Sequence, residues 1–183
     1  RNPLYDAREV FLFECYTGIR ISDILTLKWK HITDEKISIR MRKTEKLLSI
    51  PINDYVRAVL DRRRCAVENN GGKITSEKYV FNILKVDVDE VSAQDALNAI
   101  SSATAVINKQ LKKIAKKTGI DKNLSTHCAR HSYATALLTN NIPLPVIKEM
   151  LGHSDIKVTQ IYAKVVDSKR NEVVECLNKV YHG

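Results

Sequence analysis

A histidine and an arginine stand three residues apart in the stretch STHCARHSYATALL, residues 125–138. In a helix, His127 and Arg130 would lie side by side, so that both side chains reach one spot. An arginine binds a phosphate or a carboxylate through two parallel hydrogen bonds, and a histidine exchanges a proton near neutral pH. Taken alone, the stretch favours a structural role over a catalytic one: His127 would cap the helix or pack, and Arg130 would pair with a carboxylate. The rest of the chain therefore decides whether the pair does chemistry.

A second arginine follows a glycine turn in TGIRISD. The turn would fix the angle at which Arg20 leaves the surface, and Asp23 stands three residues on, where it can hold the guanidinium group. An ion pair at the start of a helix is the ordinary alternative. Lys43 stands among basic residues at the turn of a predicted hairpin. A lysine in such a turn is usually solvated, unless the turn folds over a site.

The stretch EMLGHSDIKVTQIYAKV, residues 149–165, predicts a tight junction between two helices. Gly152 gives the backbone the freedom to leave the first helix, and Ser154 or Asp155 can cap the second. His153 is therefore held at the junction, and Tyr162 follows near the end of the second helix. The ordinary alternatives are a turn histidine bonded to backbone and a half-buried surface tyrosine.

Helical periodicity dominates the elements that would position these residues. Asn2 and Gly18 are typical caps of a first helix, and Ser22 and Asn53 of two later ones. An acidic loop over residues 85–95 is the expected insertion or mobile segment. The expected helices cover residues 3–17, 23–32, 54–70, 98–118, 126–139, 143–151, 155–162 and 167–181.

Alternating apolar residues predict one β-hairpin. Ile37, Ile39 and Met41 precede a polar turn, and a second alternating run, Leu48 to Ile52, follows it. A further short strand is expected in KYVFNI, residues 78–83. The predicted fold class is mainly α with a small antiparallel β-hairpin.

Composition favours a polyanionic partner. The 183 residues carry 30 lysines and arginines against 21 acids, a net charge of +9. No apolar run approaches the roughly 18 residues of a membrane span, and no signal peptide is expected. The cysteines have no CxxC pair and are expected to be reduced and mostly buried in a cytoplasmic protein. They are Cys15, Cys65, Cys128 and Cys176.

These elements, in this order, resemble the catalytic domain of the tyrosine recombinases, also called the phage integrase family. The resemblance covers nearly the whole chain and is carried by TGIR-SD, a hairpin lysine eight residues before Pro51, H-AR, LGH and a tyrosine. Lys46 competes with Lys43 for the lysine position, but the distance to Pro51 favours Lys43. The catalytic residues that the resemblance implies are Arg20, Lys43, His127, Arg130, His153 and Tyr162, with Asp23 in support.

The resemblance implies cleavage and rejoining of DNA strands without metal or nucleotide cofactor, through a 3′-phosphotyrosyl intermediate. Tyr162 is the expected nucleophile, Arg20 and Arg130 bind the phosphate oxygens, and His153 adds a hydrogen bond. His127 takes or passes on the tyrosine proton, and Lys43 protonates the departing 5′ oxygen. The expected protein is a site-specific recombinase or integrase, and the stretch CYTGIRISDILTLKW suggests the integrase of a mobile element.

Double-stranded DNA is the expected partner, and lysines and arginines are the expected phosphate contacts. They lie on the hairpin (Arg40, Arg42, Lys46) and on the basic helix (Lys109, Lys112, Lys113, Lys116, Lys117). Family members usually carry an N-terminal helical domain, so residues 1–183 are expected to be a catalytic domain separated from it. The helix over residues 167–181 is expected either to pack on its own domain or to dock on a neighbouring copy in a tetramer on DNA. Without DNA, the sequence leaves the oligomeric state open, with a monomer as one alternative.

Three other functions fit part of the pattern. A type IB topoisomerase uses a similar residue set but relaxes supercoils. A zinc hydrolase is suggested by the spacing of His127 and His131, but Cys128 stands where the HExxH motif has its glutamate. A non-catalytic DNA-binding module could be built from short helices in a basic chain, although such a module has no need of Tyr162.

Overall fold

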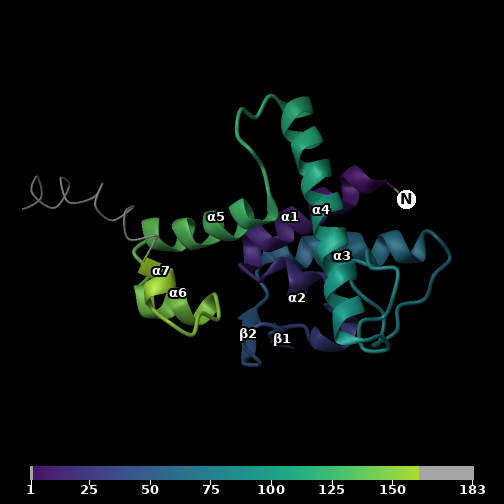
Figure 1. Ribbon diagram of the computed structural model, residues 1–183, viewed down its shortest axis with the longest axis horizontal. Helices are drawn as coiled ribbons and strands as arrows, with labels where there is room; N and C mark the ends of the chain where they lie inside the picture. Colours follow the sequence, from purple (N-terminus) through teal and green to yellow (C-terminus); the bar gives the residue numbers. More distant parts are fainter. Residues whose placement is uncertain (1, 161–183) are drawn as a thin grey trace, which may run out of the picture. The chain divides into compact units, whose positions relative to one another are not determined.

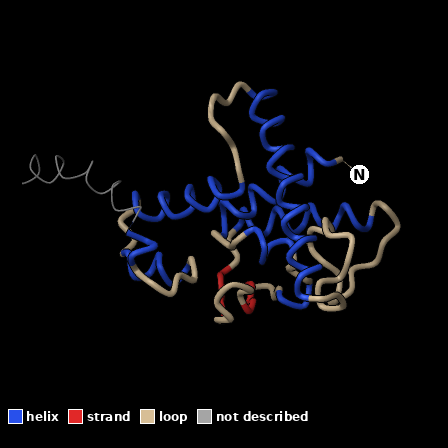
Figure 2. Tube along the Cα trace, viewed as in Figure 1, coloured by secondary structure: helices blue, strands red, loops and turns tan. Residues whose placement is uncertain are grey.

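Helices and one two-stranded sheet make up the part of the chain that the computed structural model describes, residues 2–160 (Figures 1 and 2). This composition confirms the predicted fold class. The described residues fall into two compact units that divide between Tyr133 and Ala134. The elements are α1 (Pro3–Thr17), α2 (Ile21–Leu25), η1 (Trp29–His31), β1 (Lys36–Arg40), β2 (Leu47–Pro51), α3 (Asp54–Glu68), α4 (Ala93–Thr118), α5 (Thr126–Thr139), α6 (Leu144–Met150) and α7 (Lys157–Gln160).

Helix α1 has the predicted ends and lies against α3 and α4 in the first unit. The side chain of Asn2 accepts the N–H groups of Leu4 and Tyr5 at its start. Gly18 ends it with a φ of 66°, a left-handed conformation that glycine adopts without strain. Phe13, fully buried on α1, meets Phe81 edge to face with ring centroids 5.1 Å apart. The aromatic pair fixes α1 at the centre of the core.

The hairpin also forms as predicted. β1 and β2 pair antiparallel, and Ile37 faces Ile50 while Ile39 faces Leu48. These four side chains are buried, whereas the alternate residues of both strands are exposed. The hairpin therefore has one core face and one open face, and its register fixes which residues reach the turn.

The predicted helix over residues 23–32 is wrong, because it breaks into α2 and η1. Arg20, not Ser22, occupies the N-cap position of α2, and its side chain makes no capping bond. At the other end, the Thr26 hydroxyl donates to the carbonyl of Ser22, and Lys28 has an extended backbone. Side-chain competition for helix carbonyls and a long-range pairing of Lys28 outweigh helical periodicity here.

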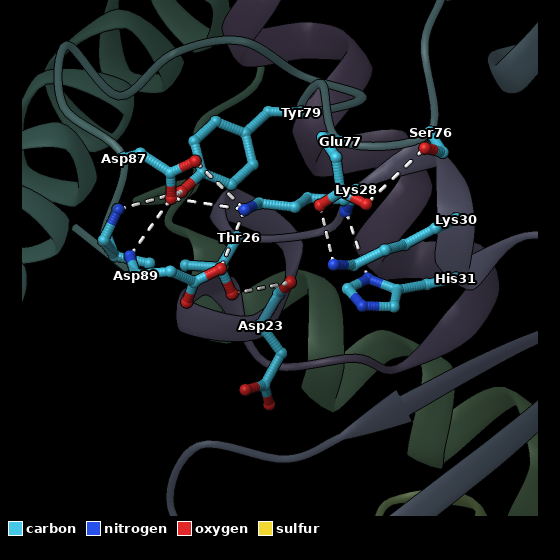
Figure 3. A network of polar contacts seen from close by, with 11 residues as sticks. Asp23, Thr26, Lys28, Lys30, His31, Ser76, Glu77, Tyr79, Asp87 and Asp89 are labelled. Atoms are coloured by element: carbon cyan, nitrogen blue, oxygen red, sulfur yellow. Dashed lines mark hydrogen bonds and ion pairs between the residues drawn. The ribbon is translucent and has the colours of Figure 1, made fainter.

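The strand expected over residues 78–83 is reduced to one isolated bridge, between Lys28 and Tyr79. Side chains hold this segment instead, as Figure 3 shows. The ammonium group of buried Lys28 lies 3.0 Å from Asp87 and 2.7 Å from Asp89, and the Tyr79 hydroxyl donates to Asp87 at 2.7 Å. Burial alone would lower the pKa of Lys28, but its bonds to Asp89 and Asp87 outweigh burial and raise that pKa. Residues 85–92 of the acidic segment form a loop, as predicted, and this ion-pair network ties it to the core, whereas residues 93–95 belong to α4.

Helix α4 begins at Ala93, five residues before its predicted start, because the Ser92 side chain caps it by accepting the N–H of Asp95. Its end at Gly119 is as predicted. The side chain of Asn108, on α4, accepts the N–H of Thr126 at 3.0 Å. That bond ties the start of α5 to α4 within the first unit.

The second unit holds the end of α5, then α6 and α7. The predicted bounds of the helices over residues 126–139 and 143–151 agree with α5 and α6 to within a residue at each end. The region expected to form a helix over residues 167–181 lies outside the described residues. No helix among the described residues is long and apolar enough to cross a membrane.

The expectation of mostly buried cysteines is wrong for the described residues. Cys65 is exposed, and Cys15 and Cys128 are only partly buried. All three are free thiols. Cys176 lies outside the described residues. Sequence spacing excludes a CxxC metal-binding pair but gives no measure of how deeply a thiol is buried.

Candidate active site

Arg20 stands between the end of α1 and the start of α2, as its place after the glycine turn predicted. Its Nη1 lies 3.3 Å from Sδ of Met41, the residue that follows β1. Met41 is buried, whereas Arg20 is partly exposed. The side chain of Arg20 is thus held against the base of the hairpin turn while part of it keeps access to solvent.

Arg130, on α5, reaches the same region from a different element. Its Nη1 donates a hydrogen bond to the carbonyl oxygen of Gly18, and the residue is 7% exposed. The left-handed turn at Gly18 directs that carbonyl away from α1, where it accepts the bond. The backbone turn that leads to Arg20 therefore also positions Arg130.

Asp23, on α2, is the buried carboxylate whose charge interacts with both arginines. Its Oδ1 accepts the backbone N–H of Arg42 at 2.9 Å, which ties α2 to the hairpin turn. Burial raises the pKa of Asp23, while that hydrogen bond and the charges of Arg20, Arg130 and Arg42 oppose the rise. Among the described residues, Oδ2 has no hydrogen-bond partner although it is buried. The predicted support of Arg20 by Asp23 stays a prediction, and the bond to Arg42 is a role that spacing did not indicate.

Glu14 is a buried acid near Arg130 that the sequence interpretation did not single out. It is 2% exposed on α1, and its Oε2 has no hydrogen-bond partner among the described residues. Burial raises its pKa to about 9, although the nearby charge of Arg130 lowers it. The signal was present as a single acid in the apolar stretch FLFECYTG. At neutral pH this carboxyl group is protonated, so it does not neutralise Arg130.

Lys43 lies in the turn between β1 and β2, as predicted, and its side chain is exposed. The turn is braced on both sides. Arg40 donates to the carbonyl of Glu45 at 2.7 Å, and the N–H of Arg42 is held by Asp23. The turn that carries Lys43 therefore has a fixed attachment to the residues around Arg20. A hollow of about 210 Å³ borders the first part of the turn; Asp23, Arg40 and Arg42 are among its lining residues, whereas Lys43 is not.

His127 lies on α5 with Arg130, as predicted, and its ring is exposed. It contacts His131, with the two Nε2 atoms 2.5 Å apart. Burial, followed by the charges of His127 and Arg130, lowers the pKa of His131. The thiol of Cys128 donates to the carbonyl of Asn123 at 3.4 Å. Within residues 2–160, no third acid, cysteine or histidine completes a metal-binding group with the two imidazoles.

His153 belongs to the second unit, where Gly152 has a left-handed conformation with a φ of 61°, which agrees with the backbone freedom expected of that glycine. Nδ1 of His153 lies 3.0 Å from Oγ1 of Thr159, which is fully buried on α7. The side chain of Asp155 accepts the N–H of Lys157, as a capping residue should. The junction thus holds the imidazole in one orientation. Tyr162 lies outside the described residues.

The first unit therefore brings together Arg20, Asp23 and Arg130, and braces the turn that carries Lys43. Two guanidinium groups close to one buried carboxyl group leave excess positive charge, which suits an anion such as a phosphodiester. The candidate DNA contacts are all exposed: Arg40, Arg42 and Lys46 at the hairpin, and Lys109, Lys112, Lys113, Lys116 and Lys117 on α4.

Known recombinases are similar to this chain in sequence. Tyrosine recombinase XerD of Listeria monocytogenes serotype 4b is 48% identical over 160 residues, covering 86% of this chain and 49% of XerD. XerA of Saccharolobus solfataricus is 30% identical over 163 residues, covering 88% of this chain and 47% of XerA. The chain spans about half the length of these curated relatives.

Solved structures show the same fold. A crystal structure of XerH site-specific recombinase bound to palindromic difH substrate, a post-cleavage complex, has a TM-score of 0.65 at 20% identity and covers 97% of this chain and 47% of that one. The crystal structure of XerA recombinase has a TM-score of 0.61 at 20% identity and covers 92% and 61%. The model of the phage integrase family matches residues 4–169. The chain therefore belongs to the phage integrase family, that of the tyrosine recombinases.

Proposed function

We propose that this chain cuts and rejoins DNA as the catalytic part of a site-specific recombinase. The observation that carries the proposal is that two arginines meet at one turn: Arg20 follows the Gly18 turn, and Arg130 donates a hydrogen bond to the carbonyl of Gly18. Guanidinium groups from two elements can bind the two non-bridging oxygens of one phosphodiester. Their positive charge stabilises the negative charge that grows on those oxygens in the transition state.

The proposed reaction needs a nucleophile and a proton transfer at each end. Tyr162 attacks the phosphorus, which forms a 3′-phosphotyrosyl bond and releases the 5′ oxygen. His127 accepts the tyrosine proton, and Lys43 donates a proton to the leaving oxygen. His153 donates a further hydrogen bond to a phosphate oxygen. The covalent bond conserves the energy of the broken phosphodiester, so that the reverse step joins a new strand without ATP.

The proposed substrate is double-stranded DNA. We further propose that the protein acts in the cytoplasm as the integrase of a mobile element. The exposed lysines of α4 and the basic residues of the hairpin support contact with phosphates. XerH, whose fold is similar, binds palindromic difH substrate in its crystal structure. Phosphate contacts place the protein on the duplex, while base contacts would set the sequence that it cuts.

The proposed assembly is a tetramer on DNA, formed through residues 167–181. The sequence places Val173, Val174, Leu177 and Val180 on one helical face, which suits docking on a neighbouring copy. Analytical ultracentrifugation of the DNA complex, with and without residues 168–183, tests this assembly. Loss of the tetramer with retained cleavage of single sites supports it, and an unchanged tetramer contradicts it.

The test of the reaction does not require a known target sequence. The protein is incubated with a pool of duplexes of randomised sequence, each nicked at one position, so that cleavage near the nick releases a short strand and traps the protein. Denaturing gels then detect covalent adducts, and sequencing of the trapped DNA gives the preferred site. We expect an adduct in the presence of a metal chelator, and none with Tyr162→Phe.

Two outcomes would contradict the proposal. An adduct that persists in Tyr162→Phe would show that another residue is the nucleophile. DNA binding without any adduct would favour the DNA-binding module. Once the site is known, strand exchange between two duplexes separates a recombinase from a topoisomerase, which would only relax supercoiled DNA.

A further inference from the structure

Two histidines of α5 are in direct contact through the Nε2 atom of each ring. Nε2 of His127 lies 2.5 Å from Nε2 of His131, and the ring planes meet at 89° with centroids 4.1 Å apart. The two residues are one helical turn apart, so the helix itself sets their separation. The ring of His127 is exposed, whereas His131 is partly buried.

A contact between two ring nitrogens restricts how protons are placed. One nitrogen must carry a proton and the other must offer a lone pair, because two N–H groups would repel each other. Two fully protonated rings are therefore excluded. Burial and the charges of His127 and Arg130 favour the neutral form of His131.

We propose that His131 is a positioning residue for His127: its Nε2 accepts the Nε2–H of His127 and fixes His127 in that tautomer. Nδ1 of His127 then keeps its lone pair and is the atom that accepts the tyrosine proton. This inference rests on the proposed function only for the last step. The tautomer itself is a property of the protein without DNA.

The opposite arrangement gives a different chemistry. If His131 donated its Nε2–H, the lone pair of His127 Nε2 would be occupied and Nδ1 of His127 would carry the proton. His127 could then donate a hydrogen bond to a phosphate but could not take a proton. A proton acceptor at this position therefore requires His127 to be the donor within the pair.

The step balances with the groups already named. The O–H bond of Tyr162 breaks and an N–H bond forms at Nδ1 of His127. The tyrosine oxygen forms its bond to phosphorus as the bond from phosphorus to the 5′ oxygen breaks, and Lys43 protonates that 5′ oxygen. The pair then carries one positive charge, which the Nε2–H bond to neutral His131 stabilises. On rejoining, Nδ1 returns the proton to the tyrosine oxygen as it leaves phosphorus.

Nuclear magnetic resonance of ¹⁵N-labelled imidazoles tests the tautomer directly on the full chain without DNA. Spectra near neutral pH distinguish a ring nitrogen that carries a proton from one that does not. The variants are His131→Phe, which removes the acceptor, and His131→Gln, whose amide oxygen can accept the same hydrogen bond. Ser132→Ala, an exposed change on the same helix, is the matched control. His127→Gln assigns the signals, and thermal unfolding shows that each variant is folded.

We expect His127 to be protonated at Nε2 and not at Nδ1 in the unaltered protein, in His131→Gln and in Ser132→Ala. His131→Phe should give a mixture of both tautomers. A proton on Nδ1 of His127 in the unaltered protein would overturn the inference, and so would an unchanged tautomer in His131→Phe. If only His131→Gln folds, the result on the unaltered protein still decides.

The second readout is the rate at which the covalent adduct forms on the DNA sequence identified by the nicked-duplex experiment. His131→Phe should slow cleavage about tenfold and shift its pH profile, and His131→Gln should restore most of the rate. Equal losses in both variants would contradict positioning through this hydrogen bond. If the tautomer is as expected but the unaltered protein forms no adduct, the proposed function fails while the positioning of His127 stands.

Discussion

Two clusters of charged side chains flank α2, and they satisfy their charges in different ways. In the cluster after α2, Lys28 binds both Asp87 and Asp89, and Tyr79 donates to Asp87 (Figure 3). In the cluster around the start of α2, Asp23 and Glu14 each have a buried carboxyl oxygen without a hydrogen-bond partner among the described residues.

The difference separates a structural network from a site. A buried lysine bound to two carboxylates holds a loop in place and leaves little for a ligand to gain. Buried carboxyl oxygens without partners cost stability, and such groups persist mainly where function needs them. The charges of Arg20 and Arg130 next to Asp23 suit the binding of a substrate anion.

The largest expected effect is the loss of cleavage activity when Arg130, in the cluster around the start of α2, is substituted. Arg130→Lys keeps a positive charge but loses the planar group that binds the carbonyl of Gly18 and that, in the proposed reaction, also binds a phosphate. Cleavage of the trapped site should fall about 10²- to 10³-fold. Arg62→Lys is the matched control, because Arg62 pairs with Glu9 on a different part of the first unit. Equal rates for both variants would remove Arg130 from the site.

Substitutions in the cluster around Lys28 should lower the stability of the protein and leave its cleavage activity unchanged. Lys28→Met keeps the apolar stem but leaves Asp87 and Asp89 without their cation, so the free energy of unfolding should fall by about 2 kcal/mol. Lys30→Met breaks an exposed ion pair with Glu77 and should cost less than about 0.5 kcal/mol. Urea unfolding measures both. A stable Lys28→Met protein with slowed cleavage would assign the network to the site.

The raised pKa of Glu14 predicts how the free energy of unfolding varies with pH. Its pKa is raised from 4.5 to about 9, so the folded chain keeps a proton that the unfolded chain loses. The free energy of unfolding should therefore fall as pH rises between these values. In Glu14→Gln this fall should be smaller by on the order of a few kcal/mol between about pH 5 and pH 8.

Urea unfolding at several pH values checks this dependence. Glu9→Gln is the matched control on the same helix, because Glu9 is bonded to Arg8 and Arg62 and its loss should destabilise the protein. Parallel pH curves for Glu14→Gln and the unaltered protein would show that Glu14 is ionised in the folded state.

The smallest effect concerns the basic face of α4, which lies outside both clusters. Lys112→Gln and Lys113→Gln should each weaken binding to duplex DNA of any sequence and lower the salt dependence of log K by about 1. Lys78→Gln, in a loop of the first unit, should change neither. Fluorescence anisotropy over a range of salt concentrations measures the slope. Unchanged slopes for the α4 variants would move the DNA contacts elsewhere.

Sequence patterns predicted the parts of the fold that depend on local rules. Asn2 and Gly18 cap α1, alternation gives the hairpin, and Gly152 turns the chain before His153. Ordered motifs also indicated the family that the comparisons show. Each of these signals lies within a few neighbouring residues, where backbone geometry and burial periodicity act directly.

Long-range contacts could not be predicted in this way. Lys28 meets Asp87 across 59 residues, and Tyr79, within the expected strand, donates to the same carboxylate. The burial of Glu14 and the bond from Arg42 to Asp23 depend on how α1, α2 and the hairpin pack. The spacing of His127 and His131 was visible, but it indicated metal ligands as readily as a hydrogen-bonded pair.

The most direct test of the central claim identifies the residue that forms the covalent bond to DNA. Adduct trapped on the nicked duplex is digested with protease and nuclease, and mass spectrometry locates the modified peptide. We predict one nucleotide joined through its 3′ phosphate to Tyr162. Attachment to any other residue, or a 5′ linkage, would contradict the proposed reaction.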